Sequence, residues 1–340
     1  MSNTDCASRF SVIIVNYNGA GMLAACLRSV LNEGVPAGKI VVVDNGSHDD
    51  SLVLAEQAAP GVRLIGNTCN AGFARAVNQG LDLASGDFVL LLNNDAQLEA
   101  NSLCAFAEAF DQIPAVLIAG GQLYYPDGRP QNAVAAIPSL AGELLPKFLL
   151  NWLKPQRLGG KSQVINPAAV ESVIGACLAV RRAGIAHLGR LDEDYFFFLE
   201  ETEWCQRARR LGYRVYHVPA ARAVHAQGQT ANHFRSAARI EFQRSKLTFF
   251  RKTQGPLAYL IVSAILPIKA LVNAASNSLI CIVTLCLRRR QRARTLGYWR
   301  IVLWHGLGRP KEWGLPNKCP RLIDRRERPG IGGAHDRNVI

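Results

Sequence analysis

The chain has 340 residues, of which 49% are hydrophobic and 19% charged, a composition typical of a folded protein that excludes an intrinsically disordered chain. Its formal net charge of +13 is concentrated at one end, because residues 288–340 hold 14 of the 39 Lys and Arg residues and 4 of the 26 Asp and Glu residues. The body of the chain is therefore nearly neutral, which argues against a nucleic-acid-binding core and for a basic segment facing an anionic surface.

Nine cysteines are scattered along the chain without a C-x-x-C pair or the spacing of a zinc site. Because their number is odd, we expect reduced thiols rather than a disulfide framework, as in a cytosolic protein. The N-terminal sequence MSNTDCASRF lacks a basic segment followed by an apolar one and so predicts no secretory signal. We therefore expect the body of the protein in the cytoplasm.

Four apolar segments in the first hundred residues are typical of buried strands. They are FSVIIVNYN (10–18), KIVVVDNGS (39–47), GVRLIGN (61–67) and DFVLLLNNDA (87–96). Helix-like sequences such as GMLAACLRSVLNEG separate them, and this alternation predicts an α/β fold with a doubly wound, mostly parallel sheet. In such a sheet the carboxyl ends of the strands share one edge, where ligands bind.

Beyond residue 120 the alternation becomes less regular. The segment 172–185 predicts a strand that leads into a helix, and 191–213 predicts a loop followed by an amphipathic helix. The segment 214–230 predicts an extended chain.

The segment 256–287 is apolar over 32 residues, and Lys269 is its one formal charge. A single membrane span needs about 20 apolar residues, and Pro267 and Lys269 divide this segment into shorter parts. We therefore expect a helical hairpin or an interfacial pair of helices rather than one clean span. The RRRQRAR sequence that follows suits a cytoplasmic, anionic leaflet, and the alternative is a buried helix pair with a solvated basic end.

Polar side chains follow several of the predicted strands. Asp44 ends the second strand, where a carboxylate can accept hydrogen bonds from a base or ribose, although Asp-Asn-Gly-Ser is also an ordinary turn. Asn70, Arg75 and Asn78 flank the start of a predicted helix, a position that suits either an anionic phosphate or a simple helix cap. Asp95 follows the fourth strand and suits Mg²⁺ or Mn²⁺ when a nucleotide diphosphate supplies further oxygens.

Two further groups lie in the second half of the chain. Glu200, Glu201 and Glu203 are expected near a helix start, where they can complement the helix dipole or provide a general base. His225 follows an apolar strand and is a candidate metal ligand, although a lone histidine is more often structural.

A competing motif lies after the first strand. Residues 19–24 fit the dinucleotide fingerprint G-x-G-x-x-G/A, and Asp44 follows 20 residues later, which favours a Rossmann dehydrogenase that uses the Gly19-Ala20-Gly21 turn. Against it, Asn16-Tyr17-Asn18 separates the strand from the glycines. This alternative also gives Asp95, the glutamate cluster and the apolar segment no role.

Taken in order, eight segments of the chain resemble the family 2 glycosyltransferases, and within them the rhamnosyltransferase-like enzymes of bacterial surface polysaccharide assembly. The segments are SVIIVNYNG, VVVDNGSHDDS, NAGFARAVNQG, LLLNNDA, GACLAVRR, FFFLEETEW, VPAARAVHAQGQT and FQRSKLTFFRKTQG. The resemblance covers residues 10–255 and implies a GT-A fold, a nucleotide-diphosphate sugar donor, a divalent metal and transfer with inversion.

The resemblance also implies a division of the chain. Residues 1–120 form the nucleotide-sugar-binding half and 121–235 the acceptor-binding half. From the apolar run and the charge distribution, the segment 236–290 is expected to form C-terminal helices that are membrane-associated, and 291–340 a basic tail. The nucleotide sugar is expected to contact Asn16, Tyr17, Asp44, Asn70, Arg75, Asn78, Asn93, Asn94 and Asp95.

The resemblance assigns Asp95 as the metal-binding carboxylate and His225 as a further ligand for Mg²⁺ or Mn²⁺. Asn93 stands where the D-x-D motif of the family has its first carboxylate, which leaves one anionic ligand fewer. Glu201 occupies the position of the catalytic base, with Glu for the usual Asp, so Glu200 and Glu203 remain alternatives. The acceptor is expected near Glu200, Glu203 and Trp204.

The expected donor is dTDP-rhamnose, with UDP-linked hexoses or galactofuranose as alternatives. The expected acceptor is a saccharide or a polyprenyl-diphosphate-linked glycan, reached at the cytoplasmic face of the inner membrane by a peripheral or monotopic protein that binds anionic lipids. No nucleic acid is expected. A third class, a sugar-nucleotide-binding membrane protein without turnover, is suggested by Asn93 and Glu201, where this chain departs from the family pattern.

Overall fold

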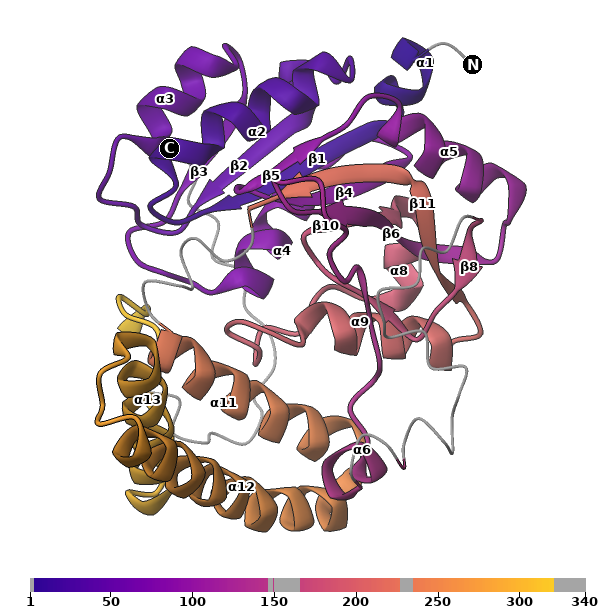
Figure 1. Cartoon of the computed structure of the whole chain (residues 1–340). Coiled ribbons are helices and arrows are strands. Elements are labelled where there is room, and N and C mark those ends of the chain that lie inside the picture. The colour runs from indigo at the N-terminus through magenta and orange to yellow at the C-terminus, as the bar shows by residue number, and fades with distance from the viewer. Residues whose placement is uncertain (1–2, 146–148, 150–165, 227–234, 321–340) are drawn as a thin grey trace.

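A mixed sheet of nine strands forms the centre of the computed structural model, which describes residues 3–145, 149, 166–226 and 235–320 (Figure 1). The strand order is β3-β2-β1-β4-β10-β6-β11-β5, and β8 pairs with β11. The strands are β1 (Phe10–Asn16), β2 (Ile40–Asp44), β3 (Arg63–Gly66), β4 (Phe88–Asn93), β5 (Ala96–Leu98), β6 (Val116–Tyr124), β8 (Ala168–Ala169), β10 (Cys177–Arg181) and β11 (Arg214–His225), with β7 (Val134–Ala135) and β9 (Ser172–Val173) as a separate pair.

Helices cover both faces of this sheet and form a further layer beneath it. They are α1 (Asn3–Ser8), α2 (Ala20–Asn32), α3 (Ser51–Ala58), α4 (Phe73–Leu83), α5 (Ser102–Gln112), α6 (Leu140–Leu144), α8 (Ile185–Leu188), α9 (Glu200–Arg210), α11 (Arg235–Thr253), α12 (Gly255–Val283) and α13 (Arg289–Gly306). The short 3₁₀ helices are η1 (Ala37–Lys39) and η2 (Arg182–Gly184).

The parallel half of the sheet contains the four strands expected from the apolar segments. β1 pairs in parallel with β2 and β4, and β2 pairs in parallel with β3. Alternate residues along β1 enter different cores: Val12 packs in the core that includes α2 and α5, while Ile13 packs in the core that includes α4 and α9. The continuous apolar runs are therefore explained by burial on both faces.

The second half of the sheet contains the long strand β11, whose C-terminal end lies beside the first half. β10 is antiparallel to both β4 and β6, and β6 is parallel to β11. β11 ends in an antiparallel pairing with β5, in which His225 lies opposite Ala96. Because Ala96 follows Asp95 directly, this pairing places His225 beside the end of β4. β6 and α5 were not anticipated from the sequence.

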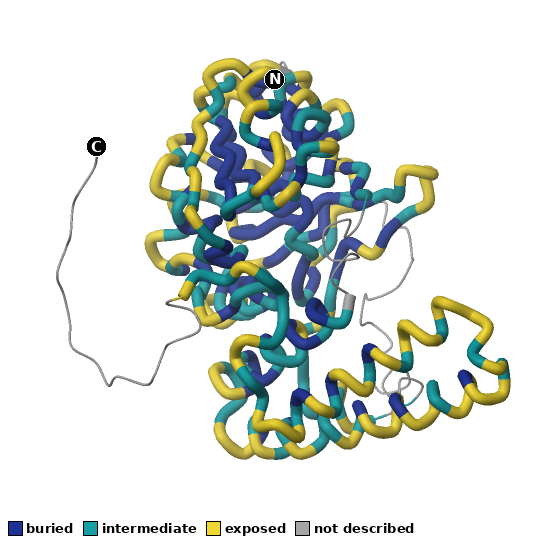
Figure 2. Tube along the Cα trace, turned by 90° about the vertical axis from the view of Figure 1, so that its left-hand side faces the viewer, coloured by how far each residue is buried: buried dark blue, intermediate teal, exposed yellow. Residues whose placement is uncertain are grey.

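The C-terminal apolar segment forms one continuous helix, α12, so the expected hairpin or helix pair within 256–287 is wrong. α12 instead packs against α11 and α13 in the layer beneath the sheet (Figures 1 and 2). Pro267 lies inside α12 and cannot donate to the carbonyl of Ser263. Arg309 replaces the missing donor, because its Nη2 lies 3.0 Å from the Ser263 oxygen.

The expectation of reduced thiols throughout is also wrong. Disulfides join Cys6 to Cys104 and Cys69 to Cys319. The other five cysteines are free thiols, namely Cys26, Cys177, Cys205, Cys281 and Cys286. Counting and spacing could not identify these pairs, because the partners lie 98 and 250 residues apart in the sequence.

Glu143 of α6 connects the segment that follows β7 to the helical layer. Its carboxylate oxygens lie 2.7 Å from Nζ of Lys246 on α11 and 2.9 Å from Nζ of Lys269 on α12. Burial alone would raise the pKa of Glu143, but the two ammonium groups outweigh burial and hold that pKa below its ordinary value of 4.5. This pairing accounts for the one charge within the apolar helix.

We predict that Glu143→Gln lowers the free energy of unfolding at pH 7 by about 1–3 kcal/mol, since the two ammonium groups lose their carboxylate. A folded-state pKa below the unfolded one contributes stability above the unfolded pKa and loses it as the pH falls through the folded pKa. The difference between variant and wild type should thus shrink below pH 4.5 in denaturant titrations. Asp127→Asn, in an exposed pair with Arg129, is the control and should have little effect. A difference that is constant with pH would contradict this role.

Candidate active site

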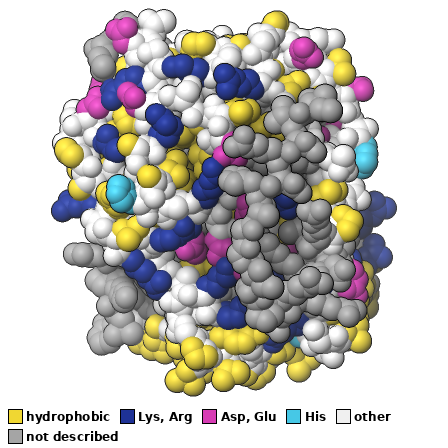
Figure 3. All heavy atoms as spheres, turned by 180° about the vertical axis from the view of Figure 1, so that it is seen from behind, with side chains coloured by type: hydrophobic (Ala, Val, Ile, Leu, Met, Phe, Trp, Pro, Cys, Tyr) yellow, Lys and Arg dark blue, Asp and Glu magenta, His cyan; other side chains and the backbone are white. Residues whose placement is uncertain are grey.

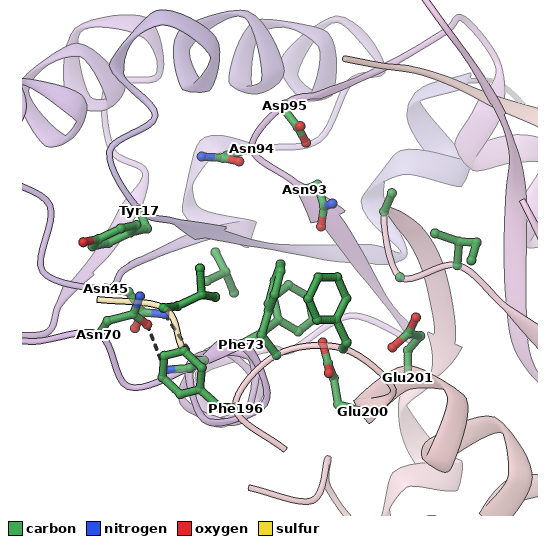
Figure 4. A pocket seen from close by; sticks show the side chains of 18 of the residues that line it. Tyr17, Asn45, Asn70, Phe73, Asn93, Asn94, Asp95, Phe196, Glu200 and Glu201 are labelled. Carbon is green, nitrogen blue, oxygen red and sulfur yellow. Dashed lines mark hydrogen bonds between the residues drawn. The ribbon is translucent and has the colours of Figure 1, made fainter. Parts of the chain in front are cut away.

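A cavity of about 320 Å³ opens at the edge of the sheet where β1 and β4 end. Figure 4 shows that the end of β4, with Asp95 and its neighbouring amides, forms one side, and that the start of α9 faces it across the cavity. Tyr17 and Asn70 lie on a third side. The structure thus brings together residues from both halves of the sheet at the edge where the sequence placed the ligand.

Asp95 and His225 form a close pair at the end of β4. Asp95 Oδ1 lies 3.2 Å from His225 Nε2, and both side chains are about nine-tenths buried. His225 Nδ1 lies 3.0 Å from Gln131 Oε1, and the Gln131 amide donates to the His225 carbonyl. Because Oε1 can only accept, the Nδ1 atom carries the proton in this contact, and Nε2 faces the Asp95 carboxylate.

The asparagines near Asp95 form a network with the end of β1. Asn94 Nδ2 donates to Asn16 Oδ1 at 2.8 Å, and Asn16 Nδ2 donates to Asp44 Oδ1 at 2.8 Å. A Cβ on Gly19 would lie 2.2 Å from Asn94 Nδ2, so the glycine is required by this network. Gly19 therefore has a packing role that needs no dinucleotide.

Asp44 is 2% exposed and is not among the residues that line the cavity. Its Oδ2 accepts from the Ser47 N–H at 2.8 Å, and its Oδ1 accepts from the Ser47 hydroxyl at 2.6 Å. The carboxylate thus orders the loop after β2. The next residue, Asn45, lines the cavity instead.

The wall opposite Asp95 depends on an unusual entry into α9. Phe198 and Leu199 both have positive φ, 73° and 68°, so the chain turns sharply before the helix begins at Glu200. Such left-handed backbone is costly for large side chains and persists only where surrounding contacts enforce it.

One of those contacts comes from the start of α4. The Phe73 N–H donates to the Phe196 carbonyl at 2.8 Å, and a Cβ on Gly72 would lie 2.7 Å from the same oxygen. Gly72 itself has φ of 86°. A glycine is therefore required both by the backbone conformation and by the close approach of the loop.

Glu200 and Glu201 both line the cavity, and their surroundings differ. Burial, followed by the charge of Glu201, raises the pKa of Glu200 well above 4.5, and its buried Oε2 has no hydrogen-bond partner among the described residues. Burial also raises the pKa of Glu201, but the Gly175 N–H donates to this carboxylate and favours its charged form. The two adjacent carboxyls therefore share one buried site in which both pKa values are raised, and Glu201 has the additional N–H of Gly175.

The other candidate residues lie outside the cavity. Glu203 forms an ion pair with Arg207 at 2.7 Å, and Trp204 is fully buried with its indole N–H on the Gly189 carbonyl. Asn78 is bound to the backbone of Leu191 and to Glu193, and the half-buried Arg75 does not line the cavity.

Several residues in or beside the cavity were not identified from the sequence. Gln131, which contacts His225, follows a turn-rich stretch and gave no signal. Phe73, Phe196, Phe197 and Phe198 line the cavity as aromatic neighbours of the glutamates. Leu315 and Pro316 reach it from the C-terminal segment, far from any predicted motif.

The residues at the end of β4 fit a divalent cation that also binds a substrate. Within the described parts of the chain, no three His, Cys, Asp or Glu side chains gather as a closed metal site. Asp95 and His225 nevertheless supply one carboxylate and one imidazole, both oriented by neighbours. A cation held by two protein ligands keeps positions for phosphate oxygens, as Mg²⁺ and Mn²⁺ commonly do.

Comparison with known proteins identifies the family. Residues 11–182, half of the chain, match the model of glycosyl transferase family 2. An N-acetylglucosaminyl-diphospho-decaprenol L-rhamnosyltransferase of Mycobacterium tuberculosis is 27% identical over 229 residues, which cover 63% of this chain and 75% of that protein. A PGL/p-HBAD biosynthesis glycosyltransferase of Mycobacterium bovis is 40% identical over 105 residues, which cover 30% of this chain and 41% of that protein.

Solved structures show the same fold. A mannosyltransferase from Pyrobaculum calidifontis in complex with GDP-Man and Mn²⁺ superposes with a TM-score of 0.54 at 19% identity, over 88% of this chain and 86% of that one. Glucosyl-3-phosphoglycerate synthase from Mycobacterium tuberculosis, with Mg²⁺ and UDP, gives 0.50 at 16% identity, over 75% and 85%. The matched segment includes Gly19-Ala20-Gly21, which removes the support for a dehydrogenase. The chain belongs to glycosyltransferase family 2, has the GT-A fold, and is an enzyme that transfers a sugar from a nucleotide donor.

Proposed function

We propose that this enzyme transfers rhamnose from dTDP-rhamnose, with inversion, to a polyprenyl-diphosphate-linked saccharide at the cytoplasmic face of the membrane. The observation that carries the proposal is the placement of Glu201 and Asp95 on facing walls of one cavity (Figure 4), with His225 beside Asp95. The sugar and the acceptor are supported by the rhamnosyltransferase relative, whose name specifies a lipid-linked acceptor.

In the proposed reaction, Glu201 takes the proton of an acceptor hydroxyl. The acceptor oxygen forms a bond to the anomeric carbon while the bond from that carbon to the diphosphate oxygen breaks, and attack from the opposite face inverts the configuration. A divalent cation held by Asp95 and His225 would offset the negative charge of the departing nucleotide. Tyr17, Asn45 and Asn70 form the wall on which the nucleoside lies.

The C-terminal helices provide the membrane contact in this proposal. By length and composition, α12 is the one helix in the described parts of the chain that could cross a membrane, and 28% of its most apolar window is buried. Small residues such as Ala258, Ala270 and Ala274 face the neighbouring helices, while large apolar side chains are exposed. In Figure 3, hydrophobic side chains gather along the lower edge of the molecule, where α12 lies.

Exposed arginines follow this apolar surface directly, at positions 288–290, 292 and 294. An apolar helix face beside a basic cluster suits a leaflet with anionic lipids. We therefore propose that α12 and α13 lie on the membrane and hold the cavity close to a lipid-linked acceptor.

The base assignment predicts different results for adjacent glutamates. Glu201→Gln should lower kcat by about 10²–10⁴-fold, while Glu200→Gln should retain most of it, because only Glu201 accepts the proton. Glu201 is inactive when protonated, and its pKa is raised, so the acid limb of the wild-type pH–rate profile should lie above pH 4.5. Steady-state rates of sugar transfer, measured over a range of pH, test both the kcat of the variants and the acid limb of the wild type. Retained activity in Glu201→Gln with loss in Glu200→Gln would reverse the assignment.

Gln131 is predicted to orient the metal-binding histidine. Gln131→Leu removes the acceptor on His225 Nδ1 and should weaken Mn²⁺ binding in the presence of dTDP about 10–100-fold, as measured by electron paramagnetic resonance of free Mn²⁺. Gln97→Leu, on the exposed face of β5, is the control. Equal Mn²⁺ affinity in all three proteins would show that Gln131 has no such role.

The membrane contact is tested by vesicle flotation. Replacing Leu271, Val272 and Leu279 together by Gln should weaken binding to vesicles that contain phosphatidylglycerol at least about tenfold, because each substitution removes an exposed apolar side chain that the membrane would bury. The control replaces Val53 and Leu211, which are exposed on the catalytic domain. Unchanged flotation of the triple variant would exclude this surface.

A further inference from the structure

The C-terminal segment 313–319, here called the strap, returns from the helical layer to the cavity. Leu315 and Pro316 line the cavity, and Asn317 Nδ2 donates to the Tyr17 hydroxyl at 2.7 Å. The sequence had predicted only a basic tail for this region. The strap instead contributes to the wall that contains Tyr17 and Asn70.

Backbone contacts join the strap to the segment before α4. The Asn70 N–H donates to the Asn317 carbonyl at 2.8 Å, and the Cys319 N–H donates to the Asn70 carbonyl at 3.1 Å. These two bonds form a parallel bridge between Asn70 and Lys318. A disulfide between Cys69 and Cys319 closes the end of this bridge.

Glu241 of α11 anchors the strap both near its start and near its end. It is fully buried, and its Oε1 accepts from the Leu315 N–H, from Arg244 and from Lys318. The Lys318 ammonium also lies 4.6 Å from the ring centroid of Phe196, an aromatic residue of the cavity. Arg244 binds the carbonyl of Trp313 at 2.8 Å. The start of the strap is therefore held by hydrogen bonds to Glu241 and Arg244, and its end by an ion pair and a covalent bond.

We propose that the strap is the outer wall of the nucleoside part of the donor site, and that the Cys69–Cys319 disulfide holds it in the binding conformation. This inference rests on the proposed function of the cavity. A strap already ordered before the donor arrives lowers the ordering cost of binding. Reduction by a dithiol transfers two electrons and two protons, turns the two sulfurs into thiols, and converts the dithiol to its own disulfide. The released strap then binds the donor more weakly.

The chain contains its own control for the test. The second disulfide, Cys6–Cys104, joins α1 to α5, and neither cysteine lines the cavity. We would measure dTDP and UDP binding with Mn²⁺ by calorimetry for the full-length wild type, Cys69→Ser, Cys319→Ser and Cys6→Ser, each with and without dithiothreitol. Peptide mapping without reductant would verify which cysteines are joined.

Cys69→Ser and Cys319→Ser should each bind nucleotide about tenfold more weakly than wild type. Dithiothreitol should weaken the wild type and Cys6→Ser to the same level and leave the two strap variants unchanged. Asn317→Ala keeps the disulfide but loses the Tyr17 contact, and it should weaken binding to a smaller extent.

Three results would overturn the inference: peptide mapping that finds no Cys69–Cys319 link, strap variants that bind like the wild type, or a reductant effect that survives in Cys319→Ser. A wild type that binds no nucleotide would overturn the proposed function instead. In that case, hydrogen exchange tests separately whether the disulfide holds the strap. Cys319→Ser should speed the exchange of residues 70–73 and 313–319. Unchanged exchange would show that the disulfide does not hold the strap.

Discussion

The close contact between Gly72 and Phe196 joins the two sides of the candidate active site. It joins the start of α4, on the parallel half of the sheet, to the loop that leads into α9. In that loop, two residues have a left-handed backbone conformation, so the chain turns sharply and the first turn of α9 faces the edge of the sheet. Without this contact the glutamates and Asp95 would belong to separate surfaces.

The cavity places three carboxylates in different surroundings, and the surroundings assign their roles. Asp95 is paired with an imidazole, Glu201 accepts the N–H of Gly175 among others, and Glu200 has a buried Oε2 without a hydrogen-bond partner among the described residues. Pairs of titratable groups with separated pKa values are how one site supplies both a neutral and a charged carboxyl at the same pH. The departures from the family pattern at positions 93 and 201 thus leave a site with the charges that the proposed reaction needs.

The parallel strands could be predicted because they are buried on both faces and read as continuous apolar runs. Asp95 could be predicted as a site residue because it follows one of these strands, and Glu201 could be predicted from the family resemblance; both line one cavity. Contacts between segments that are far apart in the sequence could not be predicted. Arg309 supplies the donor that lets α12 continue through Pro267, Gln131 meets His225 across 94 residues, and Cys319 meets Cys69 across 250. The sequence around each of these residues contains no pattern that indicates its distant partner.

The central claim is that Glu201 and the Asp95–His225 pair serve one transfer reaction, Glu201 at the acceptor hydroxyl and the pair at the nucleotide diphosphate of the donor. The most direct measurement is sugar transfer by the full-length protein with Mn²⁺, a polyprenyl-diphosphate-linked acceptor and a panel of nucleotide sugars, with the anomeric configuration of the product read by NMR. The account predicts transfer from dTDP-rhamnose with the configuration inverted relative to the donor. Transfer with retention, or no transfer from any nucleotide sugar, would contradict it.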